Sequence, residues 1–303
     1  MPVQIRGPRR TRLPLPQSRV ELFTLFEGAI RHTTLWELMV EKNIDLPCET
    51  AADTEQPEED TAEKAKEKLK LETLISYMSD KPTSKKELDV KLDLCIKVLN
   101  DDLPNIKRVC YEISDTAKDN GVKYIEVSVD PYKFVTDHSP ASVLELVKTI
   151  TEAFKEAEVK YNVKAGILLQ YQKGMLEESK EILKLCKDLK EENVVGIELA
   201  GYDFNIEAVV AEGEDPAAID FLLFNPEDIA IFEEAKTLKI HRSVHAGEFG
   251  PSDVIFQALE KLGAERIVFG YSVTQVKMKI IFYSILMQFN FMCRIIPCIM
   301  IVF

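Results

Sequence analysis

Strand-like and helix-like segments alternate along most of this chain, and this alternation constrains the fold more than any other feature. Short β-friendly apolar stretches recur with helical patterns between them, which is typical of βα units and a parallel sheet. The expected strands cover residues 19–25, 123–129, 163–170, 194–199, 240–248 and 266–272. We therefore predict an α/β fold built on a parallel sheet.

The size and charge of the chain narrow the class of protein. With 303 residues, of which 46% are hydrophobic, the chain is large enough for one domain the size of an α/β barrel. Its formal net charge at pH 7 is −13. Because nucleic-acid binding needs clustered Lys and Arg side chains, this charge argues against a nucleic-acid partner.

Cysteine usage and the N-terminus favour a cytoplasmic protein. The six cysteines form no C-x-x-C pair, and we interpret them as reduced thiols. Residues 1–18 form a basic leader interrupted by prolines, which we expect to be disordered. This leader is loosely similar to a mitochondrial presequence, but it lacks the apolar core of a signal peptide. Residues 49–68 are an acidic insertion, interpreted as solvated chain or, alternatively, as an acidic interaction site.

The most informative stretch is residues 240–248, where a short buried strand ends in His245-Ala246-Gly247-Glu248. A helical pattern follows at Pro251. Because α/β barrels place their chemistry where a strand runs into the next helix, an imidazole and a carboxylate at this edge are candidate functional groups. The plain alternative is a buried histidine at a strand end and a glutamate that caps the helix.

The order of motifs resembles the adenosine deaminase family. The matching motifs are His245-Ala246-Gly247-Glu248, the two segments Val20-Glu21-Leu22 and Gly28-Ala29 that bracket the first strand end, and the sequences Gly-Val and Tyr-Ile-Glu-Val within 121–127. The resemblance covers residues 19–275 and implies a (β/α) TIM-type barrel of the metal-dependent hydrolase kind. It also implies hydrolytic deamination of adenosine or 2′-deoxyadenosine in purine salvage and catabolism, with adenine, AMP and N6-methyl-AMP left open as substrates.

The resemblance assigns roles to three residues. His245 corresponds to a zinc ligand, and Glu248 corresponds to the catalytic general acid/base. Gly201 matches a strand-end glycine against which the nucleoside packs, although a plain turn would suit the same residue. The implied partner is therefore a small-molecule purine nucleoside, and the implied cofactor is zinc, held in the family by three His and one Asp.

Most of those metal ligands are missing from this sequence. Phe23 and Leu25 stand where the family has a His-x-His motif, and neither side chain can coordinate zinc. Phe269 stands where the family has a water-orienting His, and the paired aspartates are absent because the match ends near residue 273. His241 shares the strand face of His245 but lies too deep to replace them. We therefore expect weak or absent zinc binding and deaminase activity.

Residues 276–303 form an atypical apolar tail. The tail is long enough for a membrane span, but Arg294 and Pro297 interrupt it. We interpret it as the product of a wrong exon junction or an unspliced intron, with a C-terminal anchor as the alternative, so we do not expect a membrane partner. About six of eight barrel strands are then recognisable, and the open edges favour self-association.

Three hypotheses about function remain. The chain is a degenerate and truncated family member, a functional deaminase whose recorded C-terminus is faulty, or a non-catalytic pseudoenzyme that binds a nucleoside or another protein. Zinc content separates the first two hypotheses. Stabilisation by a ligand without zinc would support the third.

Overall fold

The computed structural model describes residues 18–46, 71–82, 85–136, 139, 141–201, 224–248, 251–272 and 301–302. Three predicted regions fall outside these residues almost entirely. They are the basic leader at 1–18, the acidic insertion at 49–68 and the apolar tail at 276–303, of which only residues 18, 301 and 302 are described.

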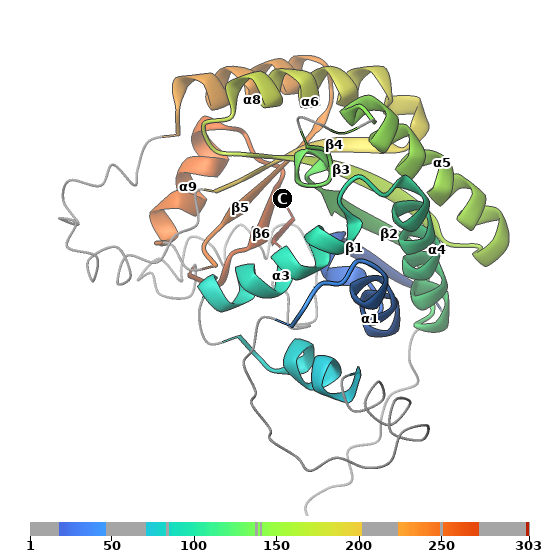
Figure 1. Ribbon diagram of the computed structural model, residues 1–303. Coiled ribbons are helices and arrows are strands. Elements are labelled where there is room, and N and C mark those ends of the chain that lie inside the picture. The colour runs from blue at the N-terminus through green and yellow to red at the C-terminus, as the bar shows by residue number, and fades with distance from the viewer. Residues whose placement is uncertain are drawn as a thin grey trace, which may run out of the picture.

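The strands form one sheet in which neighbours in the chain are neighbours in space. Strands β1 to β6 pair in parallel in chain order, and β7 pairs antiparallel with β6. The sheet curves into a nearly closed barrel with helices around its outside (Figure 1). The strands are β1 (Arg19–Leu25), β2 (Val122–Val129), β3 (Lys164–Gln172), β4 (Val194–Ala200), β5 (His241–Ala246), β6 (Arg266–Phe269) and β7 (Ile301–Val302). The six predicted strands and the TIM-type barrel are confirmed, with the fifth and sixth strands shorter than predicted.

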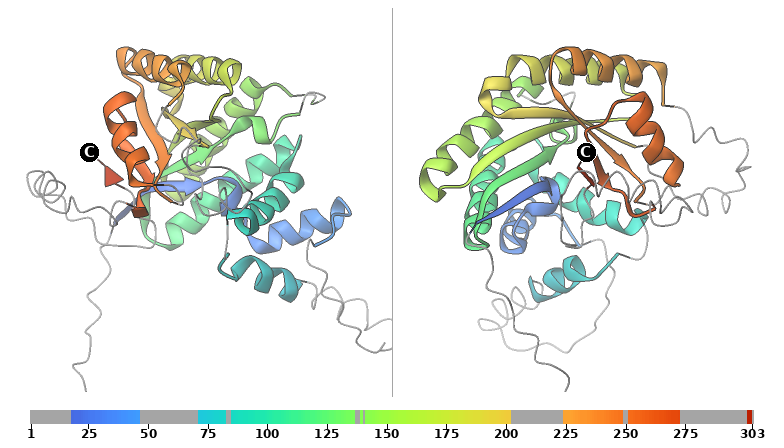
Figure 2. Two further views of the ribbon diagram at one scale, coloured as in Figure 1. Left: turned by 90° about the vertical axis from the view of Figure 1, so that its left-hand side faces the viewer. Right: turned by 180° about the vertical axis from the view of Figure 1, so that it is seen from behind.

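Helices connect successive strands and cover the outer face of the sheet (Figure 2). They are α1 (His32–Glu41), α3 (Lys85–Leu99), α4 (Leu103–Asp119), α5 (Val143–Tyr161), α6 (Leu176–Asp188), α8 (Pro226–Thr237) and α9 (Ser252–Lys261), with a further helix at 71–79. Single 3-10 turns lie at η1 (Glu27–Ala29), η2 (Pro131–Lys133) and η3 (Lys190–Glu192).

Local capping explains where two of the long helices begin. The side chain of Asp102 accepts a hydrogen bond from the Asn105 backbone at the start of α4, and Ser142 accepts one from Glu145 at the start of α5. Helix α5 ends at Asn162 in the left-handed conformation, with φ of 55°. These caps account for the residues at which α4 and α5 begin and for the residue at which α5 ends.

The interior of the barrel is more polar than its outer layer. The layer between sheet and helices is built from apolar side chains such as Val127, Ile167 and Ile197, all fully buried. Inside the barrel, strand register brings Gln170, Glu198 and Ser243 side by side on β3, β4 and β5. Barrel interiors are usually filled with branched apolar residues, so this buried polar row indicates a site that does more than fill space.

Candidate functional site

The carboxyl ends of the parallel strands meet at one mouth of the barrel, where His245, Phe23 and Phe269 come together. They lie near the ends of β5, β1 and β6. The ring centroids of His245 and Phe23 are 5.6 Å apart, those of His245 and Phe269 are 5.3 Å apart, and those of the two phenylalanines are 5.7 Å apart. All three pairs meet edge to face. The structure thus brings the predicted ligand His245 together with two residues that carry no ligand atoms.

Glu198 is the buried centre of this site, and its side chain is 0% exposed. Its Oε1 lies 2.8 Å from Nε2 of His245 and accepts a hydrogen bond from Ser128, while its Oε2 accepts a 2.7 Å bond from Ser243. Burial raises the pKa of the Glu198 carboxyl, but the charge of His245 and these hydrogen bonds outweigh burial and hold the pKa below its usual value. The imidazole of His245 is therefore oriented by a carboxylate that is itself fixed by two hydroxyl groups.

The sequence interpretation missed Glu198 and its serine partners. A signal was present, because Glu198 is the acidic residue inside the otherwise apolar strand β4. A charged residue is rarely fully buried unless it is paired. That pattern predicts a buried partner but does not say which strand supplies it.

Phe269 has an unusual backbone conformation for an aromatic residue, with φ of 75°. Such a left-handed conformation is costly for a bulky side chain and persists only where the surroundings hold it. The next residue is held in place because the Gly270 amide donates a 3.0 Å hydrogen bond to the Ala246 carbonyl oxygen. The turn after β6 is therefore set by its attachment to β5.

Glu248, Leu25 and Gly201 lie at the same mouth. Glu248 is half-buried and lies two residues beyond the end of β5. Leu25 is the last residue of β1 and is also half-buried. Gly201 directly follows β4 with φ of 92°, and an added Cβ would lie 3.1 Å from the Lys173 backbone nitrogen. A turn that needs glycine accounts for Gly201 without a ligand, so its role in substrate binding stays a proposal.

A second polar group lies at the ends of β1, β2 and β3. The Nζ of Lys133 lies 2.8 Å from Oε1 of the fully buried Glu27, and Gln172 donates a 3.0 Å hydrogen bond to Asp130. Burial raises the pKa of the Asp130 carboxyl despite the opposing effects of Gln172 and Lys133. Sequence reasoning did not select these residues, although acids within two residues of the ends of two expected strands were a usable signal.

At the opposite mouth, the charged side chains pair with one another. Arg266 pairs with Glu126, while Glu265 lies 2.7 Å from both Arg242 and His241. These five residues line part of a cavity of about 470 Å³. Residues at this end of a barrel generally serve stability, and His241 therefore lies with a structural group, away from the mouth that holds His245.

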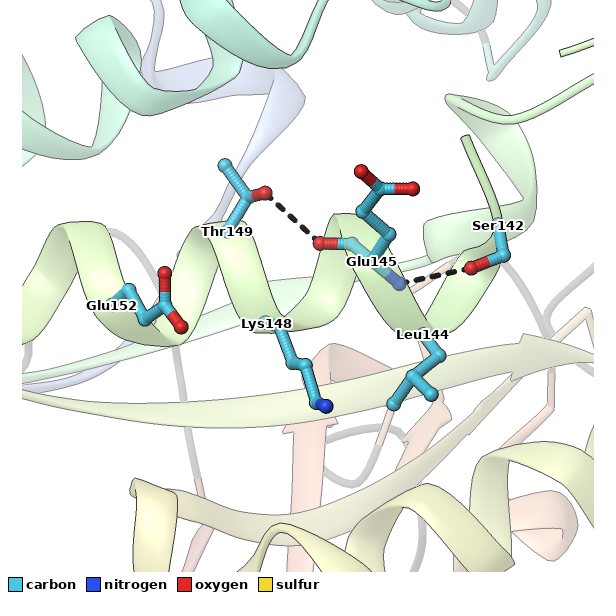
Figure 3. Close-up of a pocket in the computed structure, with 6 residues that line it drawn as sticks. All are labelled: Ser142, Leu144, Glu145, Lys148, Thr149 and Glu152. Atoms are coloured by element: carbon cyan, nitrogen blue, oxygen red, sulfur yellow. Dashed lines mark hydrogen bonds between the residues drawn. The ribbon is translucent and has the colours of Figure 1, made fainter. Parts of the chain in front are cut away.

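A pocket of about 380 Å³ also lies on the surface of α5. Figure 3 shows its lining, in which Ser142 and Thr149 make hydrogen bonds within the helix. The lining residues that the structure describes all come from this one helix and its cap. We assign no function to this pocket.

The donor atoms around His245 do not fit a zinc site. Zinc in proteins is held by at least three N, S or O ligands. Nε2 of His245 faces Glu198, both Glu198 oxygens already accept hydrogen bonds, and the neighbouring rings of Phe23 and Phe269 offer no lone pairs. In the part of the chain that the structure describes, no group of three His, Cys, Asp or Glu side chains could hold a metal ion.

Comparisons with solved structures define the class of barrel. An amidohydrolase from Burkholderia ambifaria with bound Zn aligns with a TM-score of 0.61 at 19% identity, covering 91% of this chain and 67% of that one. An adenine deaminase from Arthrobacter aurescens aligns with a TM-score of 0.60 at 18% identity, covering 86% and 66%. At these identities the likeness shows the fold, a TIM-type barrel of the amidohydrolase and deaminase kind.

Sequence comparison then identifies the family. The adenosine deaminase family model matches residues 18–299. The adenosine deaminase of Xenopus tropicalis is 30% identical over 271 residues, which cover 85% of this chain and 65% of that protein. The chain belongs to the adenosine deaminase family, and it spans about 65% of the length of the curated relatives it matches. The family and the zinc-containing structural neighbour suggest metal dependence for such barrels.

No helix among the described residues is long and apolar enough to cross a membrane. The apolar tail predicted at 276–303, with its alternative of a C-terminal anchor, lies outside the described residues except for 301 and 302.

Proposed function

We propose that this chain is a metal-poor member of the adenosine deaminase family in which hydrolytic deamination is weak or absent. The observation that supports the proposal most strongly is the environment of His245. Its Nε2 faces the buried Glu198 carboxylate, and its ring meets Phe23 and Phe269 edge to face. An imidazole held in this way lacks the neighbouring ligands that zinc requires.

The remaining side chains at the mouth support the same proposal. Hydrolytic deamination needs an activated water, a proton donor for the purine ring and groups that orient the water. We propose that Glu248 keeps the position of the proton donor. Phe269, by contrast, has no group that could accept a proton or a hydrogen bond from water.

Zinc content and turnover test this proposal together. Purified full-length protein is assayed for bound zinc by elemental analysis and for inosine released from adenosine. We expect substoichiometric zinc and little or no inosine. His245→Ala is compared with His241→Ala, a control that removes an imidazole from the other end of the same strand. Stoichiometric zinc with turnover, both lost in His245→Ala but not in His241→Ala, would refute the proposal.

A purine nucleoside is the ligand that we propose for this mouth. The proposal rests on family membership and on polar side chains at the strand ends, including Glu248, Asp130 and Gln172. Such a pseudoenzyme would bind without conversion. We expect adenosine to raise the melting temperature in the presence of EDTA, with a smaller effect in Glu248→Gln. Equal shifts with adenosine and with an unrelated sugar would count against a nucleoside site.

We also propose that the protein self-associates at the exposed amino-terminal end of β1 around Val20, away from the contacts that Leu22 and Phe23 make with β6. We further propose that it resides in the cytoplasm. Within the described ranges, β1 pairs with β2 alone, and Val20 on this strand is 62% exposed. An unpaired strand edge is a template for another chain. Size-exclusion chromatography with light scattering tests the first part, and a Val20→Lys variant should shift the protein toward monomer. The buried, unpaired thiols of Cys95, Cys110 and Cys186 suit a reducing compartment.

A further inference from the structure

We propose that four side chains form a metal-independent clasp between strands β1 and β6. The clasp consists of Phe23, His245 and Phe269 at the carboxyl ends of the strands, and of Arg266 at their amino ends. It goes beyond the proposed function, because it concerns how β1 is held against β6 and not what the barrel binds or converts.

The need for such a clasp follows from the pairing of the strands. In a closed barrel the first and last strands are joined by backbone hydrogen bonds. Among the residues that the structure describes, β1 is bonded to β2, while β6 is bonded to β5 and to the two residues of β7. Among the described residues, side chains supply contacts between β1 and β6.

At the carboxyl ends of the strands, the clasp consists of aromatic rings. The Phe23 ring from β1 meets the rings of Phe269 from β6 and His245 from β5, with interplanar angles of 76° in both cases. Edge-to-face contacts stabilise aromatic pairs beyond the area that they bury. Because Glu198 fixes the imidazole of His245, the ring against which Phe23 packs has a defined orientation.

The left-handed backbone of Phe269 is consistent with a position fixed by its neighbours. A phenylalanine with φ of 75° is not in a conformation that its own side chain prefers. The conformation aims the ring so that it meets both Phe23 and His245. We infer that these contacts help to offset the cost of the backbone conformation.

At the amino end of β6, the clasp consists of the polar contacts of Arg266. Nη1 of Arg266, the first residue of β6, donates a 3.1 Å hydrogen bond to the carbonyl oxygen of Leu22 on β1. The same nitrogen pairs with the carboxylate of Glu126 on β2, which is about nine-tenths buried. Arg266 thus contacts both β1 and β2 from β6, and its planar, permanently charged guanidinium suits such a double contact.

The clasp is tested by hydrogen exchange and urea unfolding of the full chain in EDTA. Phe23→Leu, Phe269→Leu and the double variant are compared with wild type. Each single variant should lower stability, and the double variant should show a coupling of about two- to tenfold in the unfolding equilibrium constant. Phe23→Leu should also speed amide exchange in β6, although it lies on β1. Phe23→Tyr, which keeps the ring, should retain most of the coupling.

Phe134→Leu is the matched control. It removes a ring from the Phe26–Phe134 pair, which is also edge to face with centroids 5.5 Å apart but does not reach β6. It should lower stability without speeding exchange in β6 more than in β3. If the Phe23 and Phe269 variants are additive, or if Phe23→Leu leaves exchange in β6 unchanged, the clasp does not exist.

Metal independence is tested on the wild-type protein, so it does not depend on any variant folding. Neither EDTA nor added zinc should change exchange in β1 and β6, and a saturable slowing by zinc would overturn that part of the proposal. The two proposals fail separately. Zinc-dependent inosine formation would refute the proposed function, whereas the coupling measured in EDTA addresses the clasp alone.

Discussion

Replacing Glu198 provides the most direct test of how the mouth of the barrel is organised. Glu198→Ala removes the shared partner of Ser128, Ser243 and His245. Hydrogen bonds to a charged group contribute about 1.5–3 kcal/mol each, so three of them give about 5–9 kcal/mol as an upper bound. Removing the carboxylate also relieves its desolvation, which costs several kcal/mol. The net loss should be about 3–5 kcal/mol, as found when buried pairs are broken.

The loss is measured by urea unfolding and by thermal melting. For large domains about 1 kcal/mol corresponds to 2–4 °C, so we expect the melting temperature to fall by about 6–20 °C. Glu198→Gln keeps the volume but not the charge and should lose less, about 1–3 kcal/mol. Glu156→Ala is the control, because that carboxylate pairs with Lys107 where both side chains are about half exposed. The control should lose much less stability than Glu198→Ala, because exposed ion pairs contribute little.

A small effect would refute the reasoning. If Glu198→Ala costs no more than Glu156→Ala, the carboxylate is not the fixed centre of the site. If Glu198→Gln is as damaging as Glu198→Ala, the charge is more important than the number of hydrogen bonds.

Three further predictions concern other parts of the barrel. Burial holds the pKa of Asp130 above its usual value, so the charged form of this carboxyl is disfavoured in the folded state. Asp130→Asn should therefore be more stable than wild type at pH 7. The difference in stability between the two proteins should close as the pH falls toward the usual pKa range of an aspartate. Gly247→Ala should cost about 2–4 kcal/mol in urea unfolding, because its Cβ would lie 2.5 Å from Ile255 in a backbone with φ of 80°. Cys95, whose thiol pKa is raised by burial to about 12, should be alkylated only after unfolding, as mapped by peptide mass spectrometry.

The strands were predictable because each carries a local signal. Strand β1 was predicted at its observed bounds, and β2, β3 and β4 differ from the prediction by one or two residues. Alternating strand and helix signals fix which strands are neighbours, since consecutive βα units lie side by side in a parallel sheet. The fifth and sixth strands were predicted too long because the predicted ranges included the turn residues Gly247-Glu248 and Gly270-Tyr271-Ser272.

The face of α3 that is buried depends on tertiary packing, which local sequence patterns do not determine. An apolar spacing at Leu88, Leu92, Ile96 and Leu99 favours a core stripe on α3, and the structure buries Leu99 of this set. It also buries the neighbouring residues Leu94, Cys95 and Val98. Apolar residues surround much of this helix, so its packing against η1 selects the buried face. The buried face includes Lys91, whose ammonium group donates a 2.6 Å hydrogen bond to the Asp80 carbonyl oxygen.

In the candidate site, too, local motifs located some residues, whereas others could be placed only by the tertiary fold. The motif around His245 identified the strand end, and the frame around β1 placed Phe23 at the same mouth, as the structure shows. The partner of His245 could not be found in this way, because Glu198 is 47 residues earlier and only the register of β4 against β5 brings them together. The roles of His245, Glu248 and Gly201 in binding or catalysis stay predictions.

The backbone conformation of Phe269 has a consequence for how this mouth can change during evolution. The turn is held by the Gly270–Ala246 hydrogen bond and by the contacts of the Phe269 ring with Phe23 and His245. Asn or Gly, which tolerate the left-handed region, would relieve the backbone strain at this position but would remove those ring contacts. A change of side chain here would therefore alter the chemistry of the mouth and loosen β6 from β1 at the same time.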